Sequence, residues 1–123
     1  MEELFNVRLD RQVMDAALGM YGAGGYRAQC GLVEGPLMFI GVHGKRLGLS
    51  DGAIGRLCRE FAAGFEEEFS SLICRELRPE GFHPDNPPHL CEPLTVKAIE
   101  FQYRFISAKM SDAVQNDDKG SHC

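Results

Sequence analysis

The sequence has 123 residues, of which 44% are hydrophobic and 25% charged, and its formal net charge is −5, which is typical of a single soluble domain with a modest core. The acidic balance and the lack of a basic cluster argue against binding to nucleic acid. No stretch reaches the roughly 20 apolar residues of a membrane helix, and the N-terminus lacks the basic region of a signal peptide, so we expect a cytoplasmic protein.

Two helices are predicted in the first half of the chain. Residues 10–21 begin with Asp10 as a plausible N-cap, and the glycine-rich stretch 22–25 ends this helix. Its apolar residues recur at helical spacing: Val13, Met14, Ala17, Leu18 and Tyr21. A second helix is expected from about Cys30 to Leu47. Proline costs about 3 kcal/mol in a helix interior, so Pro36 is expected in the first turn or at a kink.

The clearest amphipathic pattern covers about residues 52–77 and predicts a third helix, bent near Gly64. Its stripe consists of Ile54, Leu57, Cys58, Phe61, Phe65, Phe69, Leu72 and Ile73. Four of the six prolines fall in residues 78–90, which therefore form a predicted loop. The last helix is expected to start at Cys91 and to fade near Met110.

These elements predict an all-α fold, a compact bundle of about four helices with a Pro-rich loop before the last helix. We expect residues 1–111 to form a single helical domain. The polar composition of residues 112–123 predicts a flexible tail.

Five cysteines, at positions 30, 58, 74, 91 and 123, are the residues most suggestive of chemistry. In a reducing compartment, cysteines are more often metal-binding, redox-active or buried than paired in disulfides. Cys30 and Cys91 each stand at a predicted helix start, where the helix dipole favours a thiolate. Antiparallel packing would bring Cys74 beside them. Spacing alone leaves this open, because the sequence has no C-x-x-C pair.

The other candidate ligands are weaker. His89 precedes Cys91 by two residues and could replace a thiolate, although a solvated loop histidine is the commoner role. Cys58 lies 16 residues before Cys74, about 24 Å away along a continuous helix, and is expected to be a small buried hydrophobic residue. Cys123 lies in the predicted tail and supports no assignment.

The order of the glycines and cysteines resembles a known family. The matching features are Gly22-Ala-Gly-Gly, Cys30-Gly31-Leu32-Val33-Glu34-Gly35, the phenylalanines 61, 65 and 69, Cys74-Arg75-Glu76-Leu77 and Cys91. Over roughly residues 3–106 the chain resembles the C_GCAxxG_C_C family of putative redox-active proteins. The resemblance implies an all-helical domain with four cysteines gathered for redox work. A related segment occurs in split-Soret cytochromes, where the cysteines are associated with an iron–sulfur cluster, whose usual ligands are four thiolates.

The resemblance makes Cys30, Cys74 and Cys91 candidate ligands of an iron–sulfur cluster or another metal, and Cys30 the candidate redox thiol. Two departures from the family are visible. Leu32 stands where the motif has alanine, and the family's first cysteine would lie upstream of Met1.

The leading hypothesis is therefore a small redox or electron-transfer protein, acting through a cluster, another metal or thiol–disulfide exchange. Its expected partner is an unidentified redox protein, and a homo-oligomer is an open alternative to a monomer. Whether the chain is an enzyme is also open. The alternative hypothesis is a non-catalytic helical binding or assembly module with residual cysteines.

Overall fold

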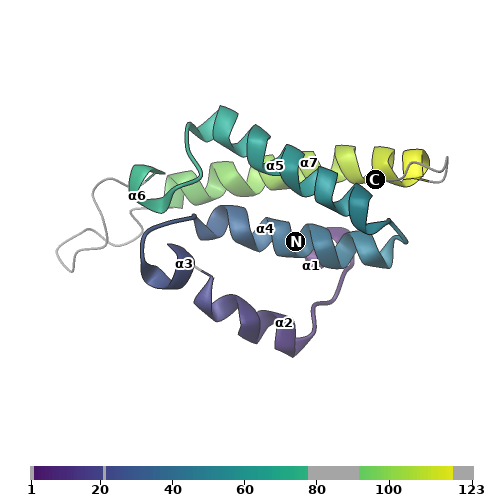
Figure 1. Ribbon diagram of the computed structural model, residues 1–123, viewed down its shortest axis with the longest axis horizontal. Coiled ribbons are helices and arrows are strands. Elements are labelled where there is room, and N and C mark those ends of the chain that lie inside the picture. Colours follow the sequence, from purple (N-terminus) through teal and green to yellow (C-terminus); the bar gives the residue numbers. More distant parts are fainter. Residues whose placement is uncertain (1, 21, 78–91, 118–123) are drawn as a thin grey trace.

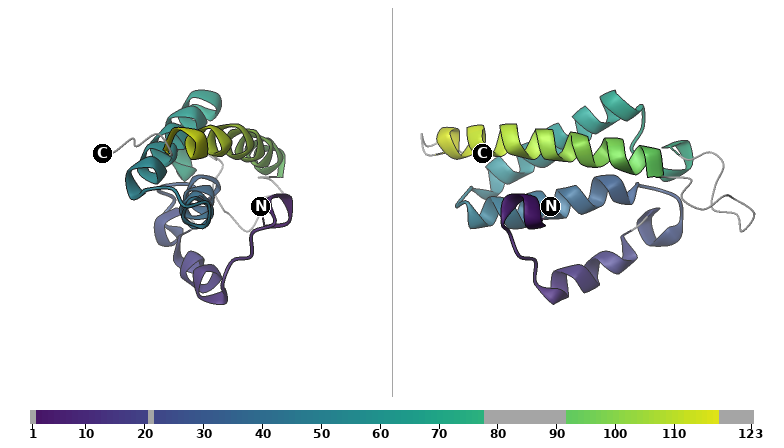
Figure 2. Two further views of the ribbon diagram at one scale, coloured as in Figure 1. Left: turned by 90° about the vertical axis from the view of Figure 1, so that its right-hand side faces the viewer. Right: turned by 180° about the vertical axis from the view of Figure 1, so that it is seen from behind.

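The computed structural model describes residues 2–20, 22–77 and 92–117, and within them the fold is all-α, as predicted, with one isolated β-bridge (Figure 1). The elements in chain order are α1 (Glu2–Phe5), α2 (Arg11–Ala16), the 3-10 turn η1 (Ala17–Gly19), α3 (Gly22–Gly25), α4 (Gly31–Arg46), α5 (Asp51–Phe69), α6 (Cys74–Leu77) and α7 (Glu92–Asp117). The long helices α4, α5 and α7 contact one another, and α2 lies on the side of α4 away from α5 and α7 (Figure 2). In the part of the chain described, no helix has the length and apolar character needed to cross a membrane.

Phenylalanines form the centre of the core between α5 and α7. Phe61 and Phe65 are completely buried on α5. The ring of Phe61 lies 5.3 Å, centroid to centroid, from those of Phe101 and Phe105 on α7, and Phe69 extends the cluster towards the end of α5. Aromatic side chains bury about 150–250 Å² each. The phenylalanine stripe of the third predicted helix therefore forms the apolar contact between α5 and α7.

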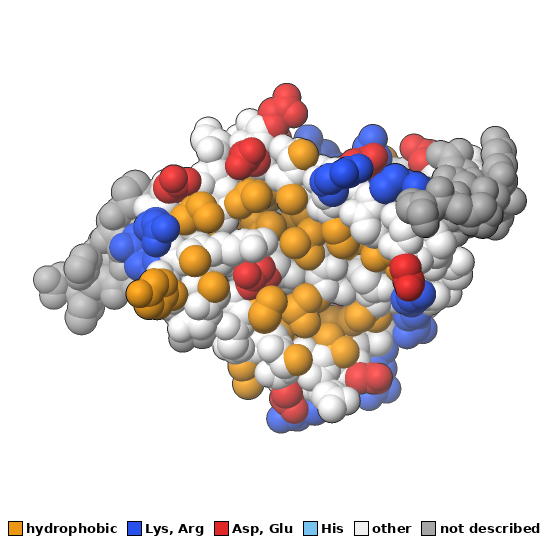
Figure 3. Space-filling view, viewed as in Figure 1, with side chains coloured by type: hydrophobic (Ala, Val, Ile, Leu, Met, Phe, Trp, Pro, Cys, Tyr) orange, Lys and Arg blue, Asp and Glu red, His pale blue; other side chains and the backbone are white. Residues whose placement is uncertain are grey.

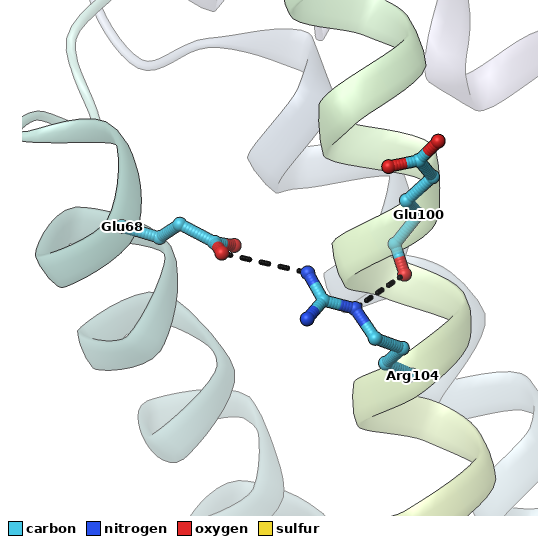
Figure 4. Close-up of polar contacts among 3 residues, drawn as sticks. All are labelled: Glu68, Glu100 and Arg104. Carbon is cyan, nitrogen blue, oxygen red and sulfur yellow. Dashed lines mark hydrogen bonds and ion pairs between the residues drawn. The ribbon is translucent and has the colours of Figure 1, made fainter.

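An ion pair links the outer surfaces of the same two helices (Figure 4). The guanidinium of Arg104 lies 3.4 Å from the carboxylate of Glu68 and also donates to the carbonyl oxygen of Glu100 on its own helix. Both charged side chains of the pair are largely exposed to solvent. Exposed pairs of this kind contribute about 0–1 kcal/mol, so burial of the phenylalanines dominates the packing of α5 on α7.

The first predicted helix differs from the observed structure. It ends earlier, since α2 stops at Ala16 and η1 at Gly19, and Tyr21 lies outside the described residues. Its predicted apolar face does not enter the core, because Met14 and Leu18 are 51% and 74% exposed. The reason is that α2 makes few contacts with the long helices α4, α5 and α7. Figure 3 shows apolar side chains at the surface of the molecule, on the side that faces the viewer in Figure 1.

Helix α4 matches the second predicted helix closely, but Pro36 lies in its interior. Proline has no N–H, so the carbonyl oxygen of Leu32, four residues earlier, loses its usual helical donor. The side-chain amide of Gln102 on α7 replaces that donor, at 3.2 Å from the Leu32 oxygen. Gln102 is only 6% exposed. The helix therefore continues through Pro36 with support from α7.

The third predicted helix breaks at two serines. Helix α5 runs without interruption to Phe69 and ends at Ser70, whose φ of 75° is left-handed. The hydroxyl of Ser71 accepts a hydrogen bond from the N–H of Ile73 at 2.9 Å. Serine competes in this way for backbone groups that a helix would use. The prediction of one continuous helix to residue 77 is thus wrong, and Cys74 starts the separate helix α6.

Helix α7 extends further than expected, to Asp117. Met110 is buried, and Ala113 and Val114 pack against the core. These positions lie three and four residues after Met110, so all three share one face of the helix. The polar residues between them concealed this stripe, so the predicted end near Met110 is wrong. Residues 118–123, and the predicted loop at 78–90, lie outside the described residues.

Candidate redox site

Cys30 is the N-cap residue of α4. Its backbone is extended, with φ −72° and ψ 138°, and its side chain does not cap the helix. Its carbonyl oxygen accepts the N–H groups of Val33 at 2.9 Å and Glu34 at 3.1 Å, which starts the helix. Cys30 therefore stands at the positive end of the α4 dipole.

The glycine-rich turn of α3 directs the chain towards this position. Gly22, Ala23, Gly24 and Gly25 all have positive φ, so α3 is a left-handed turn. The carbonyl oxygen of Gly22 accepts the N–H of Ala28 at 3.0 Å, which closes the turn. A Cβ at Gly22 would lie 3.2 Å from a backbone nitrogen in the following segment. Glycine is required there both for its φ and for this close approach.

A β-bridge places Cys74 next to Cys30. Gln29 pairs with Ile73 in an antiparallel bridge. The N–H of Cys30 donates across the bridge to a carbonyl oxygen 2.9 Å away, and the N–H of Cys74 donates in the opposite direction over 2.6 Å. The backbone segments that carry Cys30 and Cys74 therefore lie side by side, although 43 residues separate them in the sequence.

Both thiols are nearly enclosed by protein. Cys30 is 8% exposed and Cys74 is 9% exposed, and neither forms a disulfide. The hydroxyl of Ser71 also hydrogen-bonds the carboxylate of Glu76 on α6, which orders the segment that carries Cys74. Because both residues are buried, a reagent must be small or must follow a local opening to reach either thiol.

Cys58 occupies a different part of the molecule. It is half-buried on α5 against the hydrophobic core, and its thiol lies 3.9 Å from the carbonyl oxygen of Leu37 on α4. Burial raises the pKa of the Cys58 thiol. A thiol with a raised pKa is a poor nucleophile at neutral pH, so the structure supports the expected packing role of Cys58.

The described residues do not supply a ligand set for a metal cluster. No group of three or more histidine, cysteine, aspartate or glutamate side chains converges among them. An iron–sulfur cluster usually takes four thiolates, and this part of the chain brings together two. Cys91, His89 and Cys123 lie outside the described residues, so the assignments of Cys91 and His89 as ligands stay predictions.

Sequence reasoning missed Glu34, a buried acid in the first turn of α4. It is 8% exposed, and its Oε2 atom has no hydrogen-bond partner in the described part of the chain. Burial raises the pKa of the Glu34 carboxyl above its ordinary value. The available signal was a single acid four residues after Cys30, inside the otherwise uncharged run from Gly31 to Val42.

A groove of about 780 Å³ runs beside the N-terminal turns of α4 and reaches Gly31, the residue after Cys30. It is lined by Glu2, Leu9, Met14, Gly31, Leu32, Gly35, Pro36, Phe39, Ile99 and Gln102. The lining is mostly apolar. The groove therefore offers a largely apolar surface adjacent to the cysteine.

Comparison with known proteins gives one match. No curated protein and no solved structure shows significant similarity to the chain. Residues 1–105 match the family described as "Putative redox-active protein (C_GCAxxG_C_C)". This description favours redox chemistry over a purely structural assembly module. Because the match covers most of the sequence, and Cys30 and Cys74 of the family pattern are neighbours in the fold, the chain belongs to the C_GCAxxG_C_C family.

Proposed function

We propose that this protein carries out thiol–disulfide exchange, with Cys30 as the attacking thiol and Cys74 as the second thiol. The observation that carries the proposal is the Gln29–Ile73 bridge, which brings together two cysteines that are far apart in the sequence. The family description supports redox activity in general. The position of Cys30 at the N-terminus of α4 supports its role as the nucleophile.

The exchange proceeds in two balanced steps. The Cys30 thiolate attacks one sulfur of a substrate disulfide, forms a mixed disulfide and releases the other substrate sulfur, which becomes a thiol when it takes a proton. The Cys74 thiolate then attacks the Cys30 sulfur and releases the second substrate thiol. The substrate gains two electrons, and Cys30 and Cys74 are left as a disulfide. Closing that bond needs their Cα atoms within about 7 Å of each other.

The test is a redox titration of the full chain. Reduced protein is equilibrated in glutathione buffers of graded potential, and each cysteine is quantified by differential alkylation and mass spectrometry. We expect Cys30 and Cys74 to become oxidised together at one midpoint while Cys58 stays reduced. Cys30→Ser should abolish oxidation of Cys74, and the control Cys58→Ser should leave the midpoint unchanged.

Two results would overturn the proposal. One is a Cys30 thiol that stays reduced across the whole titration. The other is a stoichiometric iron–sulfur cluster in anaerobically purified protein that disappears in Cys30→Ser, which would favour the cluster alternative. The redox partner, the homo-oligomer and the cytoplasmic location expected from the sequence stay predictions.

A further inference from the structure

The groove beside the N-terminal turns of α4 is lined by exposed groups of three helices. Helix α4 lies between α2 and α7 (Figure 2), and these two helices contribute Met14 and Ile99 to the lining. Both side chains are about half exposed, at 51% and 45%. Gly35 of α4 is also exposed, and a Cβ added there would meet nothing within 4 Å. The groove therefore combines exposed apolar side chains with helix backbone that no side chain covers.

The charge at the groove is negative. Among the described residues that line it, Glu2 alone has a charged side chain. Its Oε1 atom accepts a hydrogen bond from the N–H of Leu9, another lining residue, at 2.7 Å. A carboxylate has about four acceptor positions, so it can bind a cation as well. The whole chain has a net charge of −5. A basic segment is therefore attracted to the groove, whereas a second copy of the chain or glutathione disulfide, both of them negative, is repelled.

The groove also begins next to the proposed exchange site. It reaches α4 at Gly31, the residue bonded to Cys30. Because Cys30 and Cys74 are buried, a large disulfide can react only when the structure opens locally. A substrate held in the groove stays beside the site between such openings, which raises its effective concentration there. Docking would therefore favour a protein disulfide over a free small one.

We propose that this groove docks the disulfide-bearing segment of a protein substrate with apolar side chains and a Lys or Arg, an inference that rests on the function proposed above. The apolar side chains of the segment cover Met14 and Ile99, and its cation pairs with Glu2. Because Gly35 has no side chain, the substrate backbone can approach α4 closely. The bonds that form and break are those of the two exchange steps given above, so docking requires no further reactant.

The test uses a synthetic peptide, Lys-Leu-Cys-Leu-Phe amide, as its symmetric disulfide. Mass spectrometry measures how fast it modifies Cys30 in the reduced full chain, in parallel with a polar acidic peptide disulfide, Glu-Ser-Cys-Ser-Gly amide. Each rate is divided by that of the same disulfide with 2-mercaptoethanol, so that intrinsic reactivity cancels. The normalised rate of the apolar basic peptide should be higher by about 10-fold or more, the effect of burying one apolar side chain, and should saturate with peptide concentration.

Matched substitutions locate the docking site. Met14→Lys and Ile99→Lys place a cation in the groove and should each lower the normalised rate of the basic peptide by about 10-fold. The rate with the small uncharged bis(2-hydroxyethyl) disulfide should not change. Leu18→Lys and Val96→Lys are the controls, because these exposed side chains lie within one turn of the substituted ones but do not line the groove. They should leave both rates unchanged.

Two further measurements test the cation and the binding step. Glu2→Gln keeps an oxygen for the Leu9 N–H and should remove the advantage of lysine over norleucine at the first position of the peptide. The peptide with serine in place of cysteine cannot react, so calorimetric titration of the full chain with it measures docking independently of exchange. Wild type should bind it, and Met14→Lys should weaken that binding. Circular dichroism melts verify that each variant is folded.

The outcomes distinguish the groove from the exchange. Unchanged peptide rates and binding in folded Met14→Lys and Ile99→Lys would refute docking and leave the exchange standing, as would an equal loss in the two control variants. A wild-type dimer in analytical ultracentrifugation that Ile99→Lys dissociates would also refute docking, because a second copy would then cover the groove. A Cys30 thiol that reacts with no disulfide in the wild type would instead refute the proposed exchange.

Discussion

The hydrogen bond from Gln102 to Leu32 allows the sharpest test of how α4 is held next to the site. The bond exists because Pro36 cannot donate to the Leu32 carbonyl. Gln102→Met removes the amide while it keeps the length of the side chain. The Leu32 oxygen then lies in the bundle without a donor, and an unsatisfied buried group costs about 1–3 kcal/mol. We expect a loss of unfolding free energy in that range.

A second substitution identifies the cause of the loss. Pro36→Ala supplies an N–H at the position where the helix can donate it to the Leu32 carbonyl. In that background Gln102→Met should cost close to zero, because the carbonyl keeps a donor. The volume lost on changing Pro36 is the same whether residue 102 is Gln or Met, so it cancels when the two costs of Gln102→Met are compared. The expected coupling energy between the two sites is about 1–3 kcal/mol, within the range found for residues that share a hydrogen-bond network.

Urea unfolding of the four proteins under reducing conditions measures this coupling. The slope of free energy against urea should stay constant across the set, as it does when only stability changes. Gln115→Met, at an exposed position of the same helix, is the matched control and should change stability by less than about 0.5 kcal/mol. An equal cost of Gln102→Met with and without Pro36 would refute the argument, since the amide would then act independently of the missing N–H.

Four other substitutions test local features of the fold. Gly44→Ala should lower the unfolding free energy by about 1–3 kcal/mol in urea unfolding, because the added Cβ would lie 2.8 Å from the side chain of Ile54. Gly41→Ala should instead raise the unfolding free energy by about 0.5–1 kcal/mol, because its added Cβ meets nothing within 4 Å. Ser70→Gly should raise the unfolding free energy by about 1 kcal/mol, because Ser70 has φ 75°, and an unchanged value would contradict the left-handed cap. Burial and the neighbouring Arg46 lower the pKa of His43 below 6.5, so the unfolded chain binds the proton more readily. Stability should therefore fall as pH drops below about 6.5, and His43→Phe should flatten that slope in melts recorded from pH 7 to pH 4.

Periodicity predicted the parts of the fold in which local spacing and burial agree. The stripe of Phe61, Phe65 and Phe69 has steps of four residues, and these side chains form the contact between α5 and α7. The start of α4 at Cys30 was also accessible, because a glycine-rich turn precedes an apolar run. Spacing failed for Met14 and Leu18, since an amphipathic pattern does not reveal whether a neighbouring helix covers it.

The neighbourhood of Cys30 and Cys74 depends on contacts that spacing does not encode. Sequence reasoning expected the sulfurs of Cys30, Cys74 and Cys91 to meet because long helices pack antiparallel. The structure brings the backbone of Cys30 and Cys74 together by another route, a left-handed Ser70 and a bridge between Gln29 and Ile73. The hydrogen bonds of that bridge join backbone groups, and every residue other than proline carries the same groups. Their partners therefore leave no trace in the side-chain pattern.

The first two turns of α4 contain two departures from ordinary helix chemistry, and only one of them is offset in the described structure. The missing donor of Pro36 is replaced by Gln102, whereas Glu34 stays buried with an unpartnered oxygen. Because burial raises the pKa of Glu34 above 4.5, the folded state binds its proton more tightly than the unfolded chain does. This acid therefore lowers stability as pH rises from 4.5 through its folded pKa. Glu34→Gln should abolish that slope.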